Sequence, residues 1–364
     1  MNILFLSNRS KSPWAGPYYS IPAQVKAQSK IDNVLWLNEN SKPCQEWQSS
    51  GVHFMNLKDT RANHLNTLPA PFNYPDIVIV EEIYAHRFSH IIAGVQKKGI
   101  PYVMVPRSQL TIQGQRRKPF KKWLGNLIYH KQLVRRAAAI QYLTKQEQAD
   151  SGPKWNKNSF VLPNGINLPD LPSKIFSSDK IKAVYIGRLE KYQKGLDLLL
   201  QACNQLRDEL LTSNFTLTLY GPDYDQTQMY LADLIKRYSL EQIIFLCPPV
   251  FKDDKTAALQ KAEVFIMTSR FEGHPMGLIE ALAYGLPCVV TTGTNMRSEI
   301  EKYNAGWTAD NKVESIVCAL KKMLQEREHF AQKSNHARKL AEQYNWDKIA
   351  QRSHKIYEEI IREK

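Results

Sequence analysis

Two carboxylates eight residues apart, Glu272 and Glu280, stand where a strand is expected to lead through a loop into a helix. The apolar runs at 264–267 and 287–290 are typical of buried parallel strands, and Leu278 to Tyr284 favours a helix between them. Both carboxylates should therefore lie near the carboxyl end of a parallel strand. Ligands of open α/β sheets bind at that end.

The loop between these carboxylates leads into the start of the expected helix. A helix N-terminus presents unpaired N–H groups and a partial positive charge, so this loop is a candidate phosphate site. The two carboxylates would then accept hydrogen bonds from sugar hydroxyls. Alternatively, one is a solvated loop charge and the other an exposed helix residue, and spacing alone does not separate these interpretations. The candidate donor-binding positions of the loop are His274, Met276, Gly277 and Leu278.

A second charged pair, Arg188 and Lys194, follows another expected strand at 183–186 and precedes a helix that begins near Leu196. Both cations lie at the carboxyl end of that strand, so both could converge on phosphate. The arginine would bind as a fork and the lysine as a point charge. Taken alone, this pair is a weak signal.

The two pairs together resemble the signature of the family-four retaining glycosyltransferases. Gly187-Arg188-Leu189 with Lys194-Gly195 matches the cation motif, and Glu272 with Glu280 matches the E-x7-E motif. The resemblance implies that Glu272 contacts the donor sugar and Glu280 the nucleotide ribose. It also implies that Arg188 and Lys194 neutralise the leaving diphosphate, and that the loop amides approach it.

The resemblance also implies an α/β fold of the GT-B class, in which two Rossmann-like domains face each other across a cleft. Strands that alternate with helices along this chain favour doubly wound sheets independently. We expect an acceptor domain at 1–172 and a nucleotide-sugar domain at 173–343. A terminal helix at 344–364 should cross back to the first domain, as in relatives, although packing within the second domain is an alternative.

Three positions depart from the family pattern. The loop after the first strand offers only Gly16 for the donor phosphates, where the family has a glycine pair, and Gly16 is equally compatible with an ordinary turn. Arg107 stands where the family often has a histidine; it would contact donor diphosphate or an acidic acceptor, unless it is a surface residue. Val250 follows Cys247-Pro248-Pro249 where relatives carry a glycine near the base.

The segment 115–136 contains eight basic residues and no acidic one. Trp123, Leu124, Leu127 and Ile128 have the spacing of one helical face, so an amphipathic basic helix is expected. Such a helix can dock on an anionic membrane. The same apolar stripe could equally pack into the core with a solvated basic back.

The net charge indicates which kind of partner the protein binds, and the cysteine content indicates the cellular compartment. The net charge of +14 is concentrated in residues 1–170, with 22 Lys and Arg against 10 Asp and Glu, which favours an anionic partner. Five scattered cysteines suit buried thiols in the cytoplasm. No apolar run reaches the ~20 residues of a membrane span, and no export signal is expected, so we predict a cytoplasmic protein or one peripheral to the inner face of the plasma membrane.

The predicted reaction is the transfer of a hexosyl group, with retention, from a UDP- or GDP-sugar to a saccharide or lipid-linked acceptor in surface polysaccharide synthesis, such as capsule or O-antigen. No cofactor and no metal are expected, and Asp253-Asp254 is better explained as a solvated helix start. A dinucleotide oxidoreductase would need G-x-G-x-x-G after the first strand, which is missing. A sugar-nucleotide sensor without activity and a nucleic-acid-binding protein remain as alternatives, and we expect no nucleic acid partner.

Overall fold

The computed structural model describes residues 1–8, 16–39, 52–57, 64–84, 88–116, 119–176 and 179–363. The chain divides into two compact units. The first contains Met1–Gly165 and Trp346–Lys364, and the second contains Ile166–Asn345. The chain therefore passes from the first unit to the second and returns to the first for its terminal helix.

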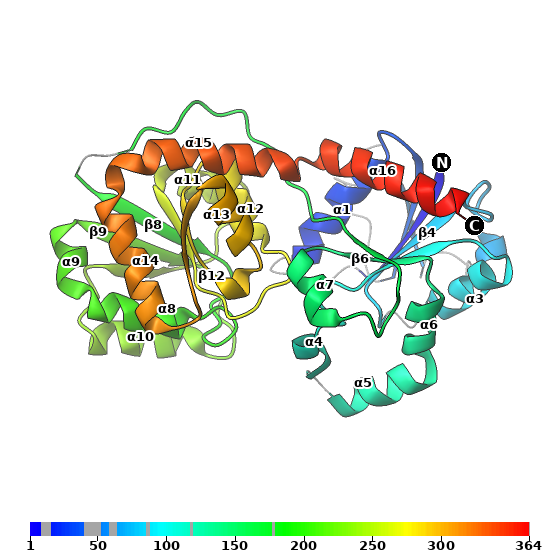
Figure 1. Cartoon of the computed structure of the whole chain (residues 1–364), viewed down its shortest axis with the longest axis horizontal. Helices are drawn as coiled ribbons and strands as arrows, with labels where there is room; N and C mark the ends of the chain where they lie inside the picture. The colour runs from blue at the N-terminus through cyan, green and yellow to red at the C-terminus, as the bar shows by residue number, and fades with distance from the viewer. Residues whose placement is uncertain are drawn as a thin grey trace. The chain divides into compact units, whose positions relative to one another are not determined.

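The first unit is built on a seven-stranded parallel sheet with the order β3-β2-β1-β4-β5-β6-β7 (Figure 1). Alternate residues of the central strand β1 point to opposite faces, with Leu4 and Leu6 in one core and Ile3 and Phe5 in the other. Its strands are β1 (Asn2–Ser7), β2 (Asn33–Asn38), β3 (His53–Asn56), β4 (Ile77–Glu81), β5 (Tyr102–Val105), β6 (Ala139–Tyr142) and β7 (Ser159–Val161).

The helices of the first unit cover both faces of this sheet, as expected for a doubly wound fold. The terminal helix α16 (Trp346–Arg362) packs beside α1 (Gly16–Gln28), and its Tyr357 is buried against the strand residues Ile3 and Phe5. The remaining helices are η1 (Leu65–Thr67), α3 (Ser89–Lys97), α4 (Ile112–Arg116), α5 (Pro119–Gly125), η3 (Asn126–His130), α6 (Lys131–Arg136) and α7 (Lys145–Ser151).

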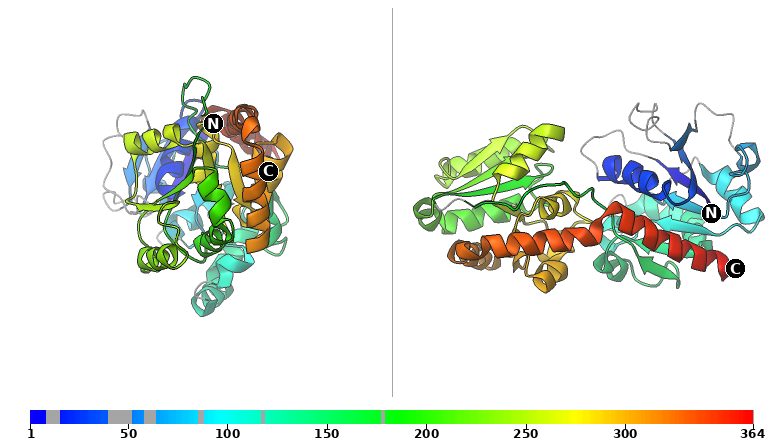
Figure 2. Two further views of the ribbon diagram at one scale, coloured as in Figure 1. Left: turned by 90° about the vertical axis from the view of Figure 1, so that its left-hand side faces the viewer. Right: turned by 90° about the horizontal axis from the view of Figure 1, so that it is seen from above.

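The second unit has a six-stranded parallel sheet with the order β10-β9-β8-β11-β12-β13, with helices on both faces (Figure 2). Tyr185 of its central strand lies in one core, and the neighbouring Val184 lies in the other. Its strands are β8 (Ile181–Ile186), β9 (Phe215–Tyr220), β10 (Ile244–Cys247), β11 (Val264–Met267), β12 (Cys288–Thr291) and β13 (Gly306–Ala309).

Most helices of the second unit connect one parallel strand to the next, and three short 3-10 turns join the later elements. Gly285, with φ of +72°, follows the end of α12, where a left-handed residue is expected to end a helix. The helices are α8 (Leu196–Gln205), α9 (Arg207–Thr212), α10 (Thr227–Arg237), α11 (Lys252–Lys261), α12 (Met276–Ala283), η4 (Thr292–Thr294), α13 (Arg297–Tyr303), α14 (Val313–Gln325), η5 (Arg327–His329), α15 (Phe330–Ala341) and η6 (Glu342–Tyr344).

The strand orders place a switch point in each sheet, where successive strands begin to be added on the other side of the first strand. In the first sheet it lies between β1 and β4, and in the second between β8 and β11. Ligands of doubly wound sheets bind at the carboxyl ends of the strands beside this point. The strands that precede the two predicted charged pairs, β8 and β11, are neighbours there.

The predicted pair of Rossmann-like domains is confirmed, and two details differ from what the sequence predicted. The units divide between Gly165 and Ile166, whereas the sequence placed the division near residue 172. Gly16, which was expected in the loop after the first strand, is the first residue of α1, a helix that contains Pro22 in its interior. None of the helices in the described ranges is both long and apolar enough to cross a lipid bilayer.

Candidate functional site

The switch point of the second sheet brings one predicted cation and one predicted acid into direct contact. Lys194 Nζ lies 2.6 Å from Glu272 Oε1, and their side chains are only 12% and 9% exposed. Ser269 Oγ donates a second hydrogen bond to the same carboxylate oxygen at 2.7 Å. The pair joins the loop after β8 to the loop after β11, and its low exposure makes the charge interaction stronger than that of a surface pair.

Arg188 is connected to the same loops through an amide side chain. Its Nη2 donates to Gln193 Oε1 at 3.2 Å, and Gln193 Nε2 donates to the carbonyl oxygen of Phe271 at 3.3 Å. The guanidinium also lies over the Tyr224 ring, 5.2 Å from its centroid. Arg188 is therefore oriented by the loop that also carries Lys194.

The backbone of these two loops is held by close packing at glycine. Gly195, with φ of +61°, leaves only 2.0 Å between an ideal Cβ position and the carbonyl oxygen of Thr268. An ideal Cβ on Gly277 would lie 2.8 Å from the carbonyl oxygen of Ile186, the last residue of β8. Both glycines let α8 and α12 start directly against the strand ends.

Glu280 has a partner that the sequence did not indicate. Lys255 of α11 donates to both of its carboxylate oxygens at 2.9 Å, and the two side chains are partly buried. This lysine lies in a run of charged residues that is typical of a solvated helix, so no local signal marks it. We therefore add Lys255 to the candidate site as the residue that orients Glu280.

The other predicted donor-binding residues of the second unit differ in how far they are buried. Met276 and Gly277 are half-buried at the start of α12, where the first N–H groups of a helix have no intrahelical acceptor. Leu278 is fully buried in the core, so only its backbone could face a ligand. His274 is buried with its ring 5.3 Å from that of Tyr344, and Val250 is half-buried after β10.

Arg107, in the first unit, is held by an internal ion pair. Its Nε lies 2.7 Å from Glu81 Oε2, with side-chain exposures of 6% and 0%, and its Nη1 donates to Ser20 Oγ and Asn164 Oδ1 at 3.2 Å. The guanidinium is therefore engaged by its own unit, and its contact with a donor stays a prediction. Gly16, at the start of α1 after β1, likewise remains a predicted donor contact.

Glu82 is a titratable group near the first switch point that sequence reasoning missed. It follows β4 with φ of +66°, and burial raises its pKa to about 7, although the nearby Arg107 lowers it. The neighbouring Glu81 and Glu39 raise this pKa further. A carboxyl with such a pKa changes its protonation state near neutral pH.

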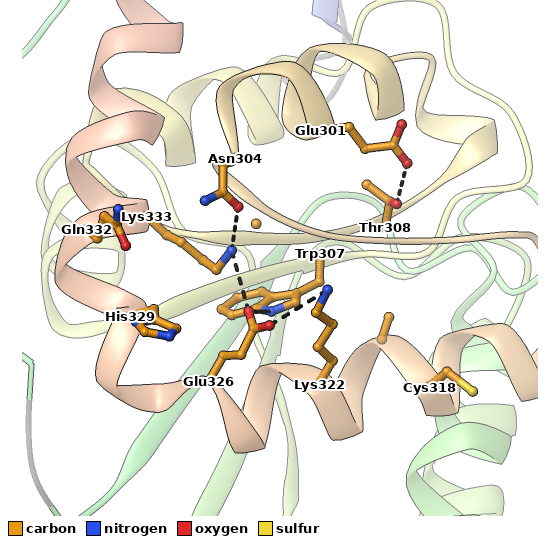
Figure 3. Close-up of a pocket in the computed structure, with 12 residues that line it drawn as sticks. Glu301, Asn304, Trp307, Thr308, Cys318, Lys322, Glu326, His329, Gln332 and Lys333 are labelled. Atoms are coloured by element: carbon orange, nitrogen blue, oxygen red, sulfur yellow. Dashed lines mark hydrogen bonds and ion pairs between the residues drawn. The ribbon is translucent and has the colours of Figure 1, made fainter.

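A separate hollow of about 560 Å³ in the second unit lies among α13, β13, α14 and α15 (Figure 3). Its polar groups pair with one another. Lys333 Nζ donates to Asn304 Oδ1 at 2.7 Å and lies 5.0 Å from the Trp307 ring centroid, while Trp307 Nε1 donates to Glu326 Oε2 at 2.8 Å (Figure 3). These contacts hold the later helices to β13, and none of the predicted site residues lines the hollow.

The family model described as glycosyl transferases group 1 matches residues 170–358, just over half of the chain. The chain belongs to this family. Its match therefore includes the cation loop, the acid loop and the two ion pairs described above, Lys194 with Glu272 and Lys255 with Glu280.

Two relatives by sequence are named as glycosyltransferases of colanic acid and of amylovoran biosynthesis. The chain is 29% identical over 153 residues to the putative colanic acid biosynthesis glycosyltransferase WcaL of Escherichia coli K12, covering 40% of this chain and 34% of WcaL. It is 29% identical over 181 residues to the amylovoran biosynthesis glycosyltransferase AmsD of Erwinia amylovora, and the match covers 49% of this chain and 48% of AmsD. The aligned regions thus span between a third and a half of these relatives.

Solved structures share the fold over the whole chain. Sucrose-phosphate synthase from Thermosynechococcus elongatus has a TM-score of 0.74 at 14% identity and covers 100% of both chains. Anabaena HepE, in complex with UDP-glucose, has a TM-score of 0.73 at 17% identity and covers 99% of this chain and 100% of its own. These likenesses confirm the predicted GT-B fold class.

Proposed function

We propose that this protein transfers a hexosyl group from a nucleotide-diphosphate sugar, UDP- or GDP-linked, to a hydroxyl of a saccharide or lipid-linked saccharide. The observation that carries the proposal is the partly buried Lys194–Glu272 pair at the switch point, with Arg188 linked to the same two loops through Gln193. HepE, which shares the fold, is named as a complex with UDP-glucose. WcaL and AmsD, which share sequence, are named for colanic acid and amylovoran biosynthesis, and we propose that this chain acts in polysaccharide synthesis.

In the proposed reaction, the bond between the anomeric carbon and the diphosphate oxygen breaks, and a bond to the acceptor oxygen forms on the same face. The acceptor proton moves to the leaving phosphate, so no side-chain base is needed. The main barrier is the charge that develops on the diphosphate. Arg188 and Lys194 would stabilise that charge, Glu272 would bind the sugar, and Glu280 the ribose.

We also propose that the reaction takes place in the cytoplasm and without a metal ion. The described cysteines are free thiols, as suits a reducing compartment; Cys203 and Cys288 are buried as expected, whereas Cys247 is half-buried and Cys318 is exposed. In this proposal Arg188 and Lys194 would both contact the diphosphate, so electrostatic stabilisation would not require a divalent ion. Transfer that persists in a chelator would support this part of the proposal, and its loss would contradict it.

The test is release of nucleoside diphosphate from a panel of UDP-, GDP- and ADP-sugars, with the anomeric configuration of the product read by NMR. Lys194→Met should lower turnover at least ~100-fold, the usual cost of removing a charge-stabilising group. Lys191→Met is the matched control, because Lys191 is an exposed lysine of the same loop. Glu272→Gln keeps the hydrogen-bonding shape and should also lose transfer.

Two results would contradict the proposal. One is full turnover in Lys194→Met, and the other is donor binding by the wild type without any release or transfer. The second result would support a sensor of sugar nucleotides. Thermal unfolding of each variant must accompany these assays, because breaking a partly buried ion pair also destabilises the fold.

A further inference from the structure

An apolar face on α5 and η3 is turned to solvent. It is made of five large side chains within nine residues, each between 43% and 74% exposed: Phe120, Trp123, Leu124, Leu127 and Ile128. Their spacing places them along one side of a helix. An amphipathic helix of a globular protein normally buries such a stripe, and α5 has no buried residue at all.

The opposite side of this helix is anchored to its own unit by polar contacts. Asn126 Nδ2 donates to Gln115 Oε1 at 2.9 Å, and Gln115 Nε2 donates to Tyr84 Oη at 3.0 Å. The rings of Tyr84 and His130 pack edge to face with centroids 4.7 Å apart. The helix therefore has a defined inner side, and the apolar face is its outer side.

The helical segment continues into α6, which differs from α5 in being packed against the core. Leu133 and Val134 are buried in the core of the first unit, so the second half of the helical segment is embedded. The first half, α5, extends beyond the layers of this unit (Figure 1). The core-packing alternative, stated for the stripe of Trp123, Leu124, Leu127 and Ile128, is therefore wrong, because these side chains are between 43% and 70% exposed.

Basic residues surround the apolar face. The segment 115–136 carries eight Lys and Arg and no acidic residue, and Arg117 and Lys118 of this set lie outside the described residues. The exposed members are Arg116, Lys121, Lys131, Arg135 and Arg136. An apolar strip with a basic border has the chemistry of a helix that lies in the interface of an anionic bilayer.

We propose that the apolar face of α5 and η3 inserts among the acyl chains of an anionic membrane while its basic border contacts the lipid phosphates. A second copy of this chain is a poorer occupant, because two identical faces would bring like charges together. Nucleic acid would use the cations but would leave most of the apolar side chains unused. The proposal does not depend on sugar transfer, although it would place the enzyme where lipid-linked acceptors are found.

The experiment is co-sedimentation of the full chain with vesicles of phosphatidylcholine alone or mixed with phosphatidylglycerol. We expect binding to the mixed vesicles. The triple variant Trp123→Ser, Leu127→Ser, Ile128→Ser should weaken binding at least tenfold. Lys121→Gln with Lys131→Gln should weaken it roughly fivefold for each charge removed, and only where anionic lipid is present.

The matched control is Ile175→Ser with Met229→Ser, which removes two exposed apolar side chains elsewhere. It should bind like the wild type. A second measurement uses vesicles with brominated acyl chains, which should quench the tryptophan fluorescence of the wild type. Trp123→Phe should still bind these vesicles, but the part of the quenching that comes from Trp123 should be missing. This measurement tests whether the apolar face inserts into the bilayer even if the triple variant fails to fold.

Three results would overturn the proposal. They are no binding to anionic vesicles, equal binding by the triple variant when it is folded, and a wild-type dimer that the triple variant abolishes. The last would assign the apolar face to a second copy of this chain.

Discussion

At the scale of single residues, each acid of the candidate site is paired with a lysine of its own unit. The two pairs are Lys194 with Glu272 and Lys255 with Glu280. A carboxylate held by a lysine has a fixed orientation, and the lysine reduces the electrostatic cost of bringing a diphosphate near it. In the proposed function, the pairs would allow two acids to line a site for a strongly anionic donor.

Lys255 should act by positioning Glu280 and not by touching the reacting atoms. In Lys255→Met, Glu280 loses both hydrogen bonds, so KM for the donor should rise about tenfold with a much smaller change in kcat. The control is Lys261→Met on the same helix, where the lysine is exposed. An unchanged KM in Lys255→Met would remove Lys255 from the site.

Glu82 should make the stability of the fold depend on pH. Its pKa in the folded chain is raised to about 7, so the folded state holds a proton that the unfolded chain releases near the ordinary value of 4.5. The contribution of protonated Glu82 to the free energy of unfolding is therefore complete below pH 4.5, and it is lost as the pH rises through 7. Glu82→Gln should match the wild type at pH 4.5 and exceed it at pH 8 by up to ~3 kcal/mol.

Urea unfolding at the two pH values measures this difference. Glu359→Gln is the control, because Glu359 is an exposed carboxylate of α16 in the same unit. If the gain of Glu82→Gln is the same at both pH values, the raised pKa is not its cause.

At the scale of elements, the site depends on how closely α12 starts against β8. In Gly277→Ala the new methyl group would lie 2.8 Å from the carbonyl oxygen of Ile186, so the helix start must move. We expect a loss of stability of ~1–3 kcal/mol and at least a tenfold loss of donor affinity.

The comparison variant is Gly152→Ala. Gly152 has φ of +71° with no atom within 4 Å of an ideal Cβ, so the substitution strains the backbone without a collision. It should cost ~1–2 kcal/mol of stability and leave donor affinity unchanged. Equal donor affinity in Gly277→Ala would show that the start of α12 does not shape the site.

The sequence predicted the helices and strands well, but it did not predict which of them lie side by side. Apolar runs and helix-ending residues located β11, α12 and β12, but no local signal specifies that β8 lies beside β11. Lys255 was missed for the same reason, because its partner is 25 residues away and only the packing of α11 brings them together. The apolar stripe of α5 has the same periodicity whether it is buried or exposed, so its exposure had to come from the structure.

At the scale of the whole molecule, the chain completes its first unit with its last helix. Tyr357 of α16 is fully buried among residues of β1 and α1, and its hydroxyl donates to Gln141 Oε1 at 3.3 Å. Tyr357→Ala should therefore destabilise the first unit by ~3–5 kcal/mol. Lys355→Ala, on the exposed side of the same helix, should change stability by less than ~0.5 kcal/mol, and equal denaturant midpoints for both would contradict this account.

The central claim is that the second unit holds a nucleotide-diphosphate sugar on Arg188, Lys194, Glu272 and Glu280. Thermal unfolding with UDP-, GDP- and ADP-sugars tests it most directly. One nucleotide class at about 100 times its Kd should stabilise the wild type and Lys191→Met by ~2.7 kcal/mol, and should not stabilise Lys194→Met. Stabilisation of Lys194→Met to the same extent, or of the wild type by none of these donors, would contradict the claim.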